Sequence, residues 1–173
     1  MLKFDNDGER ISADDWEEHQ DHIGRYAYAA PVVQRGEKVN DIACGVGYGS
    51  VFFRHASYRG YDRPGVPRAD KFPGAYYAVD LDDPCWVPQL ADVTVCFETL
   101  EHVRDPVHFA DVIAQTTRRA VILSVPLYPR EENKFHLTTF TEADVPPLFL
   151  DFCVADEWPQ PEARGHVWLF HRK

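Results

Sequence analysis

The chain has 173 residues, and its 18 lysines and arginines against 28 aspartates and glutamates give a formal net charge of −10. This length suits one domain, and 45% hydrophobic residues supply enough apolar side chains for a core, which excludes a disordered chain. Nucleic acids and anionic membranes are bound by clustered lysines and arginines, so the acidic balance argues against both as partners. We find no apolar run of the roughly 20 residues that span a membrane and no signal peptide.

Four cysteines, Cys44, Cys85, Cys96 and Cys153, lie far apart in the chain and form no C-x-x-C pair. Three of them lie among apolar neighbours, which predicts buried free thiols in a cytoplasmic protein rather than a disulfide framework or a zinc site. His19 and His22 are three residues apart with no evident third ligand, so no metal site is expected.

The first half of the chain is predicted as follows. Residues 1–11 form a polar arm, and residues 12–173 form a single domain. A helix begins near Ser12, which forms a capping pattern with Asp15, and ends near Ala30, before Pro31. A short strand at 38–43 ends in a glycine-rich turn, and a short helix follows at 49–56. Strands are expected at 57–61 and 75–79, and the proline-rich segment 63–74 between them does not suit a regular helix.

The second half continues the alternation of strands and helices. Strands are predicted at 92–97 and at 120–125, the latter a continuous apolar run typical of a buried parallel strand. Asp105 and Pro106 begin a helix that ends near Thr116. A short helix is expected at 141–150, and two strands, 152–155 and 166–171, close the chain. This alternation predicts an α/β fold with a sheet between two layers.

The sharpest motif is Asp41-Ile-Ala-Cys-Gly-Val-Gly-Tyr-Gly49. A strand runs here into glycines that let a ligand approach the backbone before a helix begins. Asp62 lies 17 residues after Gly45, at the end of the second strand, where a carboxylate can accept hydrogen bonds from both hydroxyls of a ribose. The plain alternative is a tight turn that binds nothing.

Two ligands compete for this loop. Gly45-Val-Gly-Tyr-Gly-Ser50 nearly fits the dinucleotide fingerprint, which places a pyrophosphate at the helix N-terminus. Asp41 stands just ahead of the glycines, and its carboxylate would repel a pyrophosphate and attract an ammonium group. S-adenosylmethionine carries an ammonium and a sulfonium but no phosphate, so charge complementarity favours it over NAD.

Five ordered motifs resemble those of the class I, Rossmann-like S-adenosylmethionine-dependent methyltransferases of the methyltransferase-11/23-like branch, from about residue 19 to nearly the end of the chain. The glycine-rich stretch resembles motif I of that family. The others, in chain order, are His22-Ile-Gly-Arg-Tyr26, Val79-Asp80-Leu81, Asp92–Phe97 continuing into Glu98-Thr-Leu-Glu-His102-Val-Arg-Asp-Pro106, and Ser124-Val-Pro126 with His136-Leu-Thr-Thr-Phe-Thr141.

The resemblance implies a seven-stranded, mostly parallel sheet with an antiparallel last strand, in which the helix between strands two and three is reduced or absent. It also implies S-adenosylmethionine as the cofactor. Asp41, Ala43, Cys44, Gly45 and Gly47 would hold its amino-acid part, Asp62 its ribose, and Asp80 with Leu81 its adenine. Phe97 and Glu98 would line the floor, and Arg25 or Tyr26 would reach the methionine carboxylate.

The chain departs from the family pattern at several positions. Asn40 replaces an apolar residue in the first strand and needs a hydrogen bond if it is buried. Val46 stands where threonine is common, and Tyr128 stands near a position where asparagine is frequent. The proline-rich loop replaces a helix. The last two departures affect the expected acceptor pocket more than the cofactor pocket.

Methyl transfer depends largely on alignment of the reacting groups, and a general base is needed only if the acceptor must lose a proton early. His102, after the fourth strand, is the leading candidate base; packing against the next helix is its alternative role. His136 follows the fifth strand and could face the acceptor, or lie on a surface loop. Glu98 and Glu101 could bind a cationic or hydroxylated acceptor.

The main functional hypothesis is an enzyme that methylates an oxygen or nitrogen of a small molecule or saccharide. Alternatives are a protein or nucleic-acid methyltransferase and a non-catalytic cofactor-binding subunit. Phe97-Glu-Thr-Leu100 stands where enzymes that methylate base amino groups carry N/D-P-P-Y/F, which, with the negative charge, disfavours nucleic acid. The chain is barely longer than the fold requires, so a homodimer or a partner subunit could complete the substrate pocket.

Overall fold

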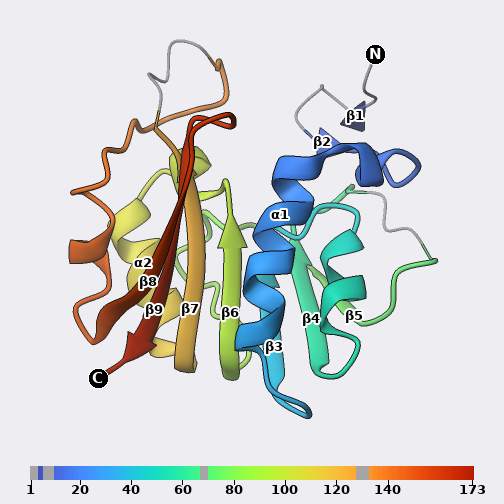
Figure 1. The fold of residues 1–173 in the computed structure, drawn as a ribbon, viewed down its shortest axis with the longest axis horizontal. Helices are drawn as coiled ribbons and strands as arrows, with labels where there is room; N and C mark the ends of the chain where they lie inside the picture. Colours follow the sequence, from blue (N-terminus) through green and yellow to red (C-terminus); the bar gives the residue numbers. More distant parts are fainter. Residues whose placement is uncertain (1–3, 6–9, 67–69, 128–132) are drawn as a thin grey trace.

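A single seven-stranded sheet runs through the molecule in the order β5-β4-β3-β6-β7-β9-β8 (Figure 1). The computed structural model describes residues 4–5, 10–66, 70–127 and 133–173. The strands are β3 (Lys38–Ile42), β4 (Ser57–Asp62), β5 (Ala75–Ala78), β6 (Ala91–Phe97), β7 (Thr117–Pro126), β8 (Phe152–Gln160) and β9 (Gly165–Arg172). Strands β5 to β7 pair in parallel, and β9 is antiparallel to both β7 and β8. The predicted mostly parallel sheet with an antiparallel last strand is confirmed.

The order of the strands reverses at β3, which pairs with β4 on one side and with β6 on the other. The register places Ile42 of β3 opposite both Tyr61 and Cys96, so the carboxyl ends of three strands meet at one edge. In open α/β sheets, a ligand crevice forms at such a switch point.

Helical segments cover both faces of the sheet, and in Figure 1 α1 crosses the near face while α2 lies behind. The two α-helices are α1 (Gln20–Ala29) and α2 (Pro106–Gln115). The 3₁₀ turns are η1 (Trp16–Glu18), η2 (Ala30–Val32), η3 (Tyr48–Phe53), η4 (Leu100–His102) and η6 (Pro146–Leu148).

Alternate side chains of β7 belong to two different apolar clusters. Val121 and Leu123 of β7 join α2 in one cluster, whereas Ala120 and Ile122 join α1 and η3 in the other. Since successive side chains of a strand point to opposite faces, this division confirms the predicted three layers.

Three predicted helices are wrong in extent or type. The helix expected from Ser12 begins only at Gln20, because the Ser12 hydroxyl accepts from the Asp14 backbone N–H at 3.2 Å and forms a local turn instead of a helix cap. Residues 49–56 were expected as a helix, and η3 takes their place. Within 141–150, Asp144 accepts from the Thr141 N–H as the pattern suggested, but Pro146 and Pro147 remove the donors of a longer helix, and only η6 forms.

Three further predictions concern the start of α2, the N-terminal arm and the cysteines. Asp105 caps α2 by accepting from the His108 N–H at 3.0 Å, as expected. The arm before residue 12 contains a short antiparallel pair, β1 (Phe4–Asp5) with β2 (Arg10–Ile11), rather than irregular chain alone. All four cysteines are free, but only Cys44 and Cys96 are buried, so the expectation of three buried thiols is wrong.

The segment between β4 and β5 contains no helix in its described residues, 63–66 and 70–74, as expected from its prolines. Tyr128 lies outside the described residues. Among the helices that the structure describes, none is both long enough and apolar enough to cross a membrane.

Gly47 is required by the packing at the switch point. Its φ is +96°, and a Cβ atom there would overlap the ring of Tyr76, whose hydroxyl donates to the Gly47 carbonyl at 3.1 Å. We expect Gly47→Ala to lower the free energy of unfolding by about 2–4 kcal/mol, from the left-handed backbone and the overlap together. Urea unfolding measures this change.

Gly36→Ala is the matched control for this substitution. Gly36 also has a positive φ, +83°, but nothing lies within 4 Å of its Cβ position. Gly36→Ala should therefore lower the free energy of unfolding only through the left-handed backbone, by about 1–2 kcal/mol. Equal losses in the two variants would contradict a packing role for Gly47.

Candidate functional site

A cavity of about 520 Å³ opens at the carboxyl edge of β3, β4 and β6. Its wall includes all the site residues predicted from the sequence except Asp41 and Gly47. The predicted residues that line it are Arg25, Tyr26, Ala43, Cys44, Gly45, Asp62, Asp80, Leu81, Phe97, Glu98, His102 and His136. Segments far apart in the sequence therefore meet at the switch point.

The backbone is left-handed at three positions of the cavity wall. Ala43 follows β3 with φ of 61°, and Glu98 follows β6 with φ of 48°. Non-glycine residues seldom adopt this conformation, and such residues gather at functional sites. Gly45, with φ of 57°, has no atom within 4 Å of its Cβ position, so open space lies directly above the loop backbone.

Asp62 links the ends of two strands. One carboxylate oxygen accepts from the Gly45 N–H and the other from the Arg63 N–H, both at 2.7 Å. These backbone contacts fix the carboxylate at the cavity wall, where its side chain is 8% exposed. Asp80 is more exposed, and its Oδ1 accepts from the Asp82 N–H at 3.0 Å.

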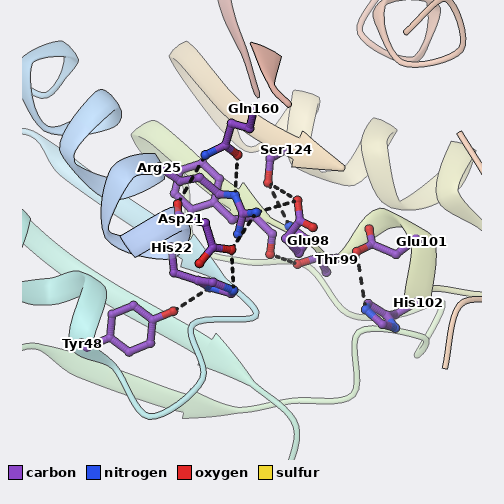
Figure 2. A network of polar contacts seen from close by, with 11 residues as sticks. Asp21, His22, Arg25, Tyr48, Glu98, Thr99, Glu101, His102, Ser124 and Gln160 are labelled. Atoms are coloured by element: carbon purple, nitrogen blue, oxygen red, sulfur yellow. Dashed lines mark hydrogen bonds and ion pairs between the residues drawn. The ribbon is translucent and has the colours of Figure 1, made fainter. Parts of the chain in front are cut away.

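Arg25 reaches the cavity from α1 although it is only 1% exposed (Figure 2). Its Nε donates to Gln160 at 2.8 Å, and its Nη2 lies 3.4 Å from Asp21 and 3.7 Å from Glu98. Its Nη1 donates no hydrogen bond to any described residue. A buried guanidinium with a donor to spare at a cavity wall suits an anionic group such as a carboxylate.

Asp41 lies behind the wall, not on it. It is 1% exposed and accepts hydrogen bonds from the hydroxyls of Tyr26, at 3.0 Å, and Tyr58, at 2.6 Å. Burial raises the pKa of this carboxyl to about 7, against the lowering effect of the two hydroxyls. Gly47 is also absent from the wall because Tyr76 covers it. Direct contact of either residue with a ligand stays a prediction.

Glu101, His102 and His136 gather at one end of the cavity. The imidazole rings of His102 and His136 pack edge to face with centroids 4.9 Å apart, and His102 Nε2 lies 3.5 Å from the Glu101 carboxylate. Burial, and then the charge of His102, lower the pKa of His136 to about 4, so its ring is neutral at physiological pH.

Several wall residues were not assigned to the site from the sequence. His22 contacts the Tyr48 hydroxyl through Nδ1 at 3.1 Å, and burial lowers the pKa of its imidazole to about 3. Its spacing of three from Arg25 places both on one face of α1, and this signal could have found it. Asn133 and Phe135 also line the cavity, but their loop carries no pattern that predicts this.

Two other sequence expectations concern buried groups. Asn40 is fully buried, and its amide donates to the Gln89 carbonyl at 2.6 Å, whereas its Oδ1 accepts nothing from the described residues. Burial raises the pKa of the Cys44 thiol, which disfavours a nucleophilic role for that cavity residue.

Comparisons with known proteins reveal a likeness of fold. No family model matches the chain, and no curated protein matches its sequence. Magnesium protoporphyrin IX methyltransferase from Synechocystis PCC 6803, with bound S-adenosylhomocysteine, superposes with a TM-score of 0.71 at 18% identity, over 90% of this chain and 84% of that one.

Two further structures are similar to the same extent. The N-methyltransferase NodS from Bradyrhizobium japonicum, in complex with S-adenosylhomocysteine, gives a TM-score of 0.72 at 13% identity, covering 93% of both chains. A chain from the Haloferax volcanii complex between the Trm112 methyltransferase activator and a methyltransferase candidate gives 0.70 at 16% identity, over 92% of this chain and 94% of that one. The chain therefore has the fold of the class I methyltransferases.

The raised pKa of Asp41 predicts how stability depends on pH. Between about pH 4 and pH 7, the folded protein keeps a proton on Asp41 that the unfolded chain has released. Raising the pH through this window therefore destabilises the fold, by on the order of 4 kcal/mol. Asp41→Asn, which cannot ionise, should remove this dependence. Urea unfolding at pH 5 and pH 8 measures it.

Asp111→Asn is the control, because Asp111 is exposed and its substitution changes the net charge in the same way; among the described residues, its carboxylate accepts only from the exposed Gln115 amide. The stability of Asp41→Asn relative to the unsubstituted protein should improve between pH 5 and pH 8, and that of the control should not. The same pH response in both variants would refute a buried, protonated Asp41.

Proposed function

We propose that the protein is an S-adenosylmethionine-dependent methyltransferase that acts on an oxygen or nitrogen of a small molecule or saccharide. The observation that carries this proposal is the cavity at the switch point, whose wall is built from the residues that the five sequence motifs single out. The class I methyltransferase fold supports it, as do the similar structures that contain S-adenosylhomocysteine. The free thiols agree with a cytoplasmic location.

The cavity offers groups that fit each part of this cofactor. The spare Nη1 donor of Arg25 suits the methionine carboxylate, and the open space above Gly45 suits the close approach of the amino-acid part. In our proposal, Asp62 accepts from the ribose hydroxyls, and Asp80 with the Leu81 backbone binds the adenine. Phe97 and Glu98 form the floor beside the sulfur.

Asp41 enters this proposal through Tyr26 rather than by direct contact. The Tyr26 hydroxyl donates to Asp41 at 3.0 Å, and the Tyr26 ring lies at the cavity wall. The carboxylate thus holds a wall residue in place. The negative charge that favours a cationic ligand, which the sequence placed on Asp41, is then supplied by Glu98 and Asp62, because these two residues line the cavity.

When bound, the cofactor supplies a methyl group activated by the positive charge on sulfur. The protein has to exclude water and align an acceptor with that methyl group. The acceptor would lie beside His102 and His136, our candidate catalytic residues, because these line the part of the cavity contributed by η4 and the 133–136 loop.

A second candidate is a cofactor-binding subunit that needs a partner for activity. The likeness to a chain of a complex with a methyltransferase activator favours this reading. A second copy of the chain could also close the acceptor side. A macromolecular acceptor is the remaining alternative.

Isothermal titration calorimetry with S-adenosylmethionine and S-adenosylhomocysteine tests the cofactor site. We expect one site per chain and a loss of affinity of at least about tenfold in Asp62→Ala, since the substitution removes the carboxylate proposed to accept from both ribose hydroxyls. Asp70→Ala, an exposed aspartate in the loop before β5, should bind as the unsubstituted protein does. Absence of heat with both ligands, or full affinity in Asp62→Ala, would overturn the assignment.

A second measurement separates the enzyme from the binding subunit. Release of S-adenosylhomocysteine is followed while the protein is offered a library of hydroxylated and amino metabolites. Turnover with at least one small acceptor is the expected result. The binding subunit is favoured instead if the protein binds the cofactor but methylates no acceptor, both in the metabolite library and after addition of the small-molecule filtrate of a cell extract.

A further inference from the structure

One end of the cavity brings together three side chains of the kind that bind metal ions. A carboxylate oxygen of Glu101 and one ring nitrogen each of His102 and His136 lie within 4.8 Å of one another. They come from η4 and from the loop at 133–136, which are about 35 residues apart in the chain. Glu101 is 1% exposed and His136 7% exposed, whereas the His102 side chain is 25% exposed, so two of the three side chains are buried and the third is partly open to solvent.

Backbone hydrogen bonds join the two segments that carry the cluster. The Glu101 carbonyl accepts from the N–H groups of Leu137, at 2.7 Å, and Thr138, at 3.2 Å. The cluster is therefore held by main-chain contacts, which do not depend on the side chains that face one another. Neighbouring ligands of a tetrahedral ion with bonds of about 2.1 Å are about 3.4 Å apart, so the side chains, whose ligand atoms lie within 4.8 Å of one another, would have to move closer to close the set.

The two imidazoles are oriented by neighbouring polar groups. His102 Nδ1 lies 3.1 Å from the Phe135 carbonyl, and because a carbonyl only accepts, Nδ1 carries the proton. When the ring is neutral, the lone pair of Nε2 then faces the Glu101 carboxylate at 3.5 Å. Histidine ligands of metals are commonly fixed in this way by a carbonyl on the opposite nitrogen. The Asn133 amide nitrogen donates to His136 Nε2 at 3.0 Å, because its Oδ1 accepts from the Phe135 N–H. This contact orients the second ring, and Nε2 would have to release it to bind an ion.

We infer that Glu101, His102 and His136 form a binding site for a divalent metal ion at the acceptor end of the cavity. Two imidazoles and one carboxylate suit Zn²⁺, Mn²⁺ or Co²⁺ better than Mg²⁺, which prefers oxygen ligands. Three protein ligands leave at least one coordination position open. Glu98 is not part of this group, and its Oε1 accepts from Ser124 at 2.8 Å and lies 3.7 Å from Arg25 Nη2.

The open position lies toward the cavity, since all three ligands line it. This inference rests on the proposed function, and it narrows the acceptor to a compound that is methylated on an oxygen. A hydroxyl bound to such an ion would become more acidic. The acceptor oxygen then forms its bond to the methyl carbon as the carbon–sulfur bond breaks. Sulfur keeps that electron pair, and the hydroxyl proton passes to water.

This inference changes the expected role of the histidines. With its Nδ1–H on a carbonyl and its Nε2 on the ion, His102 has no free nitrogen to act as a general base. It becomes a ligand, as does His136. The alternative is an ion pair between a protonated His102 and Glu101, which would need no metal.

Metal binding is measured directly on the untagged full-length chain after treatment with a chelator. We expect one equivalent of Co²⁺ to bind and produce a visible absorption band, with Zn²⁺ competing for the same site. His136→Ala and His102→Ala should each weaken Co²⁺ binding by at least about tenfold to a hundredfold. The exposed histidine of α2 provides the control, and His108→Ala should bind Co²⁺ as the unsubstituted protein does.

Calorimetry with S-adenosylhomocysteine on the same variants keeps the two proposals apart. The His136→Ala and His102→Ala variants should retain cofactor binding, which also shows that they fold. Failure of the unsubstituted protein to bind Co²⁺ or Zn²⁺ at micromolar concentration, or unchanged binding in both variants, would overturn the metal site. If cofactor binding persists in that case, the proposed methyltransferase function still stands.

Discussion

The buried carboxylate of Asp41 is the contact on which the arrangement of the switch point depends. It accepts from Tyr26 on α1 and from Tyr58 on β4, so one side chain of β3 joins a helix on the near face to the neighbouring strand. A Cβ atom on Gly49 would overlap both Tyr26 and this carboxylate, which brings the loop after β3 into the same unit. Because Arg25 precedes Tyr26 in α1, the docking of Tyr26 also decides where the guanidinium enters the cavity.

The cavity follows from a second constraint, which is that three parallel strands end side by side. Each end turns away sharply, and two of these turns use non-glycine residues in the left-handed region, Ala43 and Glu98. Such conformations persist only where surrounding contacts hold them. Asp62 supplies one of these contacts by accepting from the Gly45 N–H, and Ser124 supplies another through its hydroxyl, which accepts from the Glu98 N–H at 3.1 Å. The strained turns are thus held by polar groups at the cavity itself.

The sequence predicted the strands and the glycine turn after β3 from local patterns, and its resemblance to the methyltransferases implied the seven-stranded sheet and most of the predicted cavity wall. It failed where the outcome depends on contacts between distant segments. It does not show that the hydroxyls of Tyr26 and Tyr58, from other elements, donate to Asp41, whose contact with a ligand stays a prediction. The helix expected at Ser12 does not begin there, because the Ser12 hydroxyl forms a local turn with the Asp14 N–H. No sequence pattern joins Glu101 and His102 to His136, since nothing in the sequence shows that a loop 34 residues later returns to η4.

The segment after β6 divides the cavity into two chemically different ends. Glu98 turns toward Arg25 and Ser124, and only three residues later Glu101 turns toward His102, as Figure 2 shows. Glu98 itself has a left-handed backbone, with φ of 48°, and η4 follows it in the chain. One short segment therefore places one acidic group beside an arginine and another beside two imidazoles.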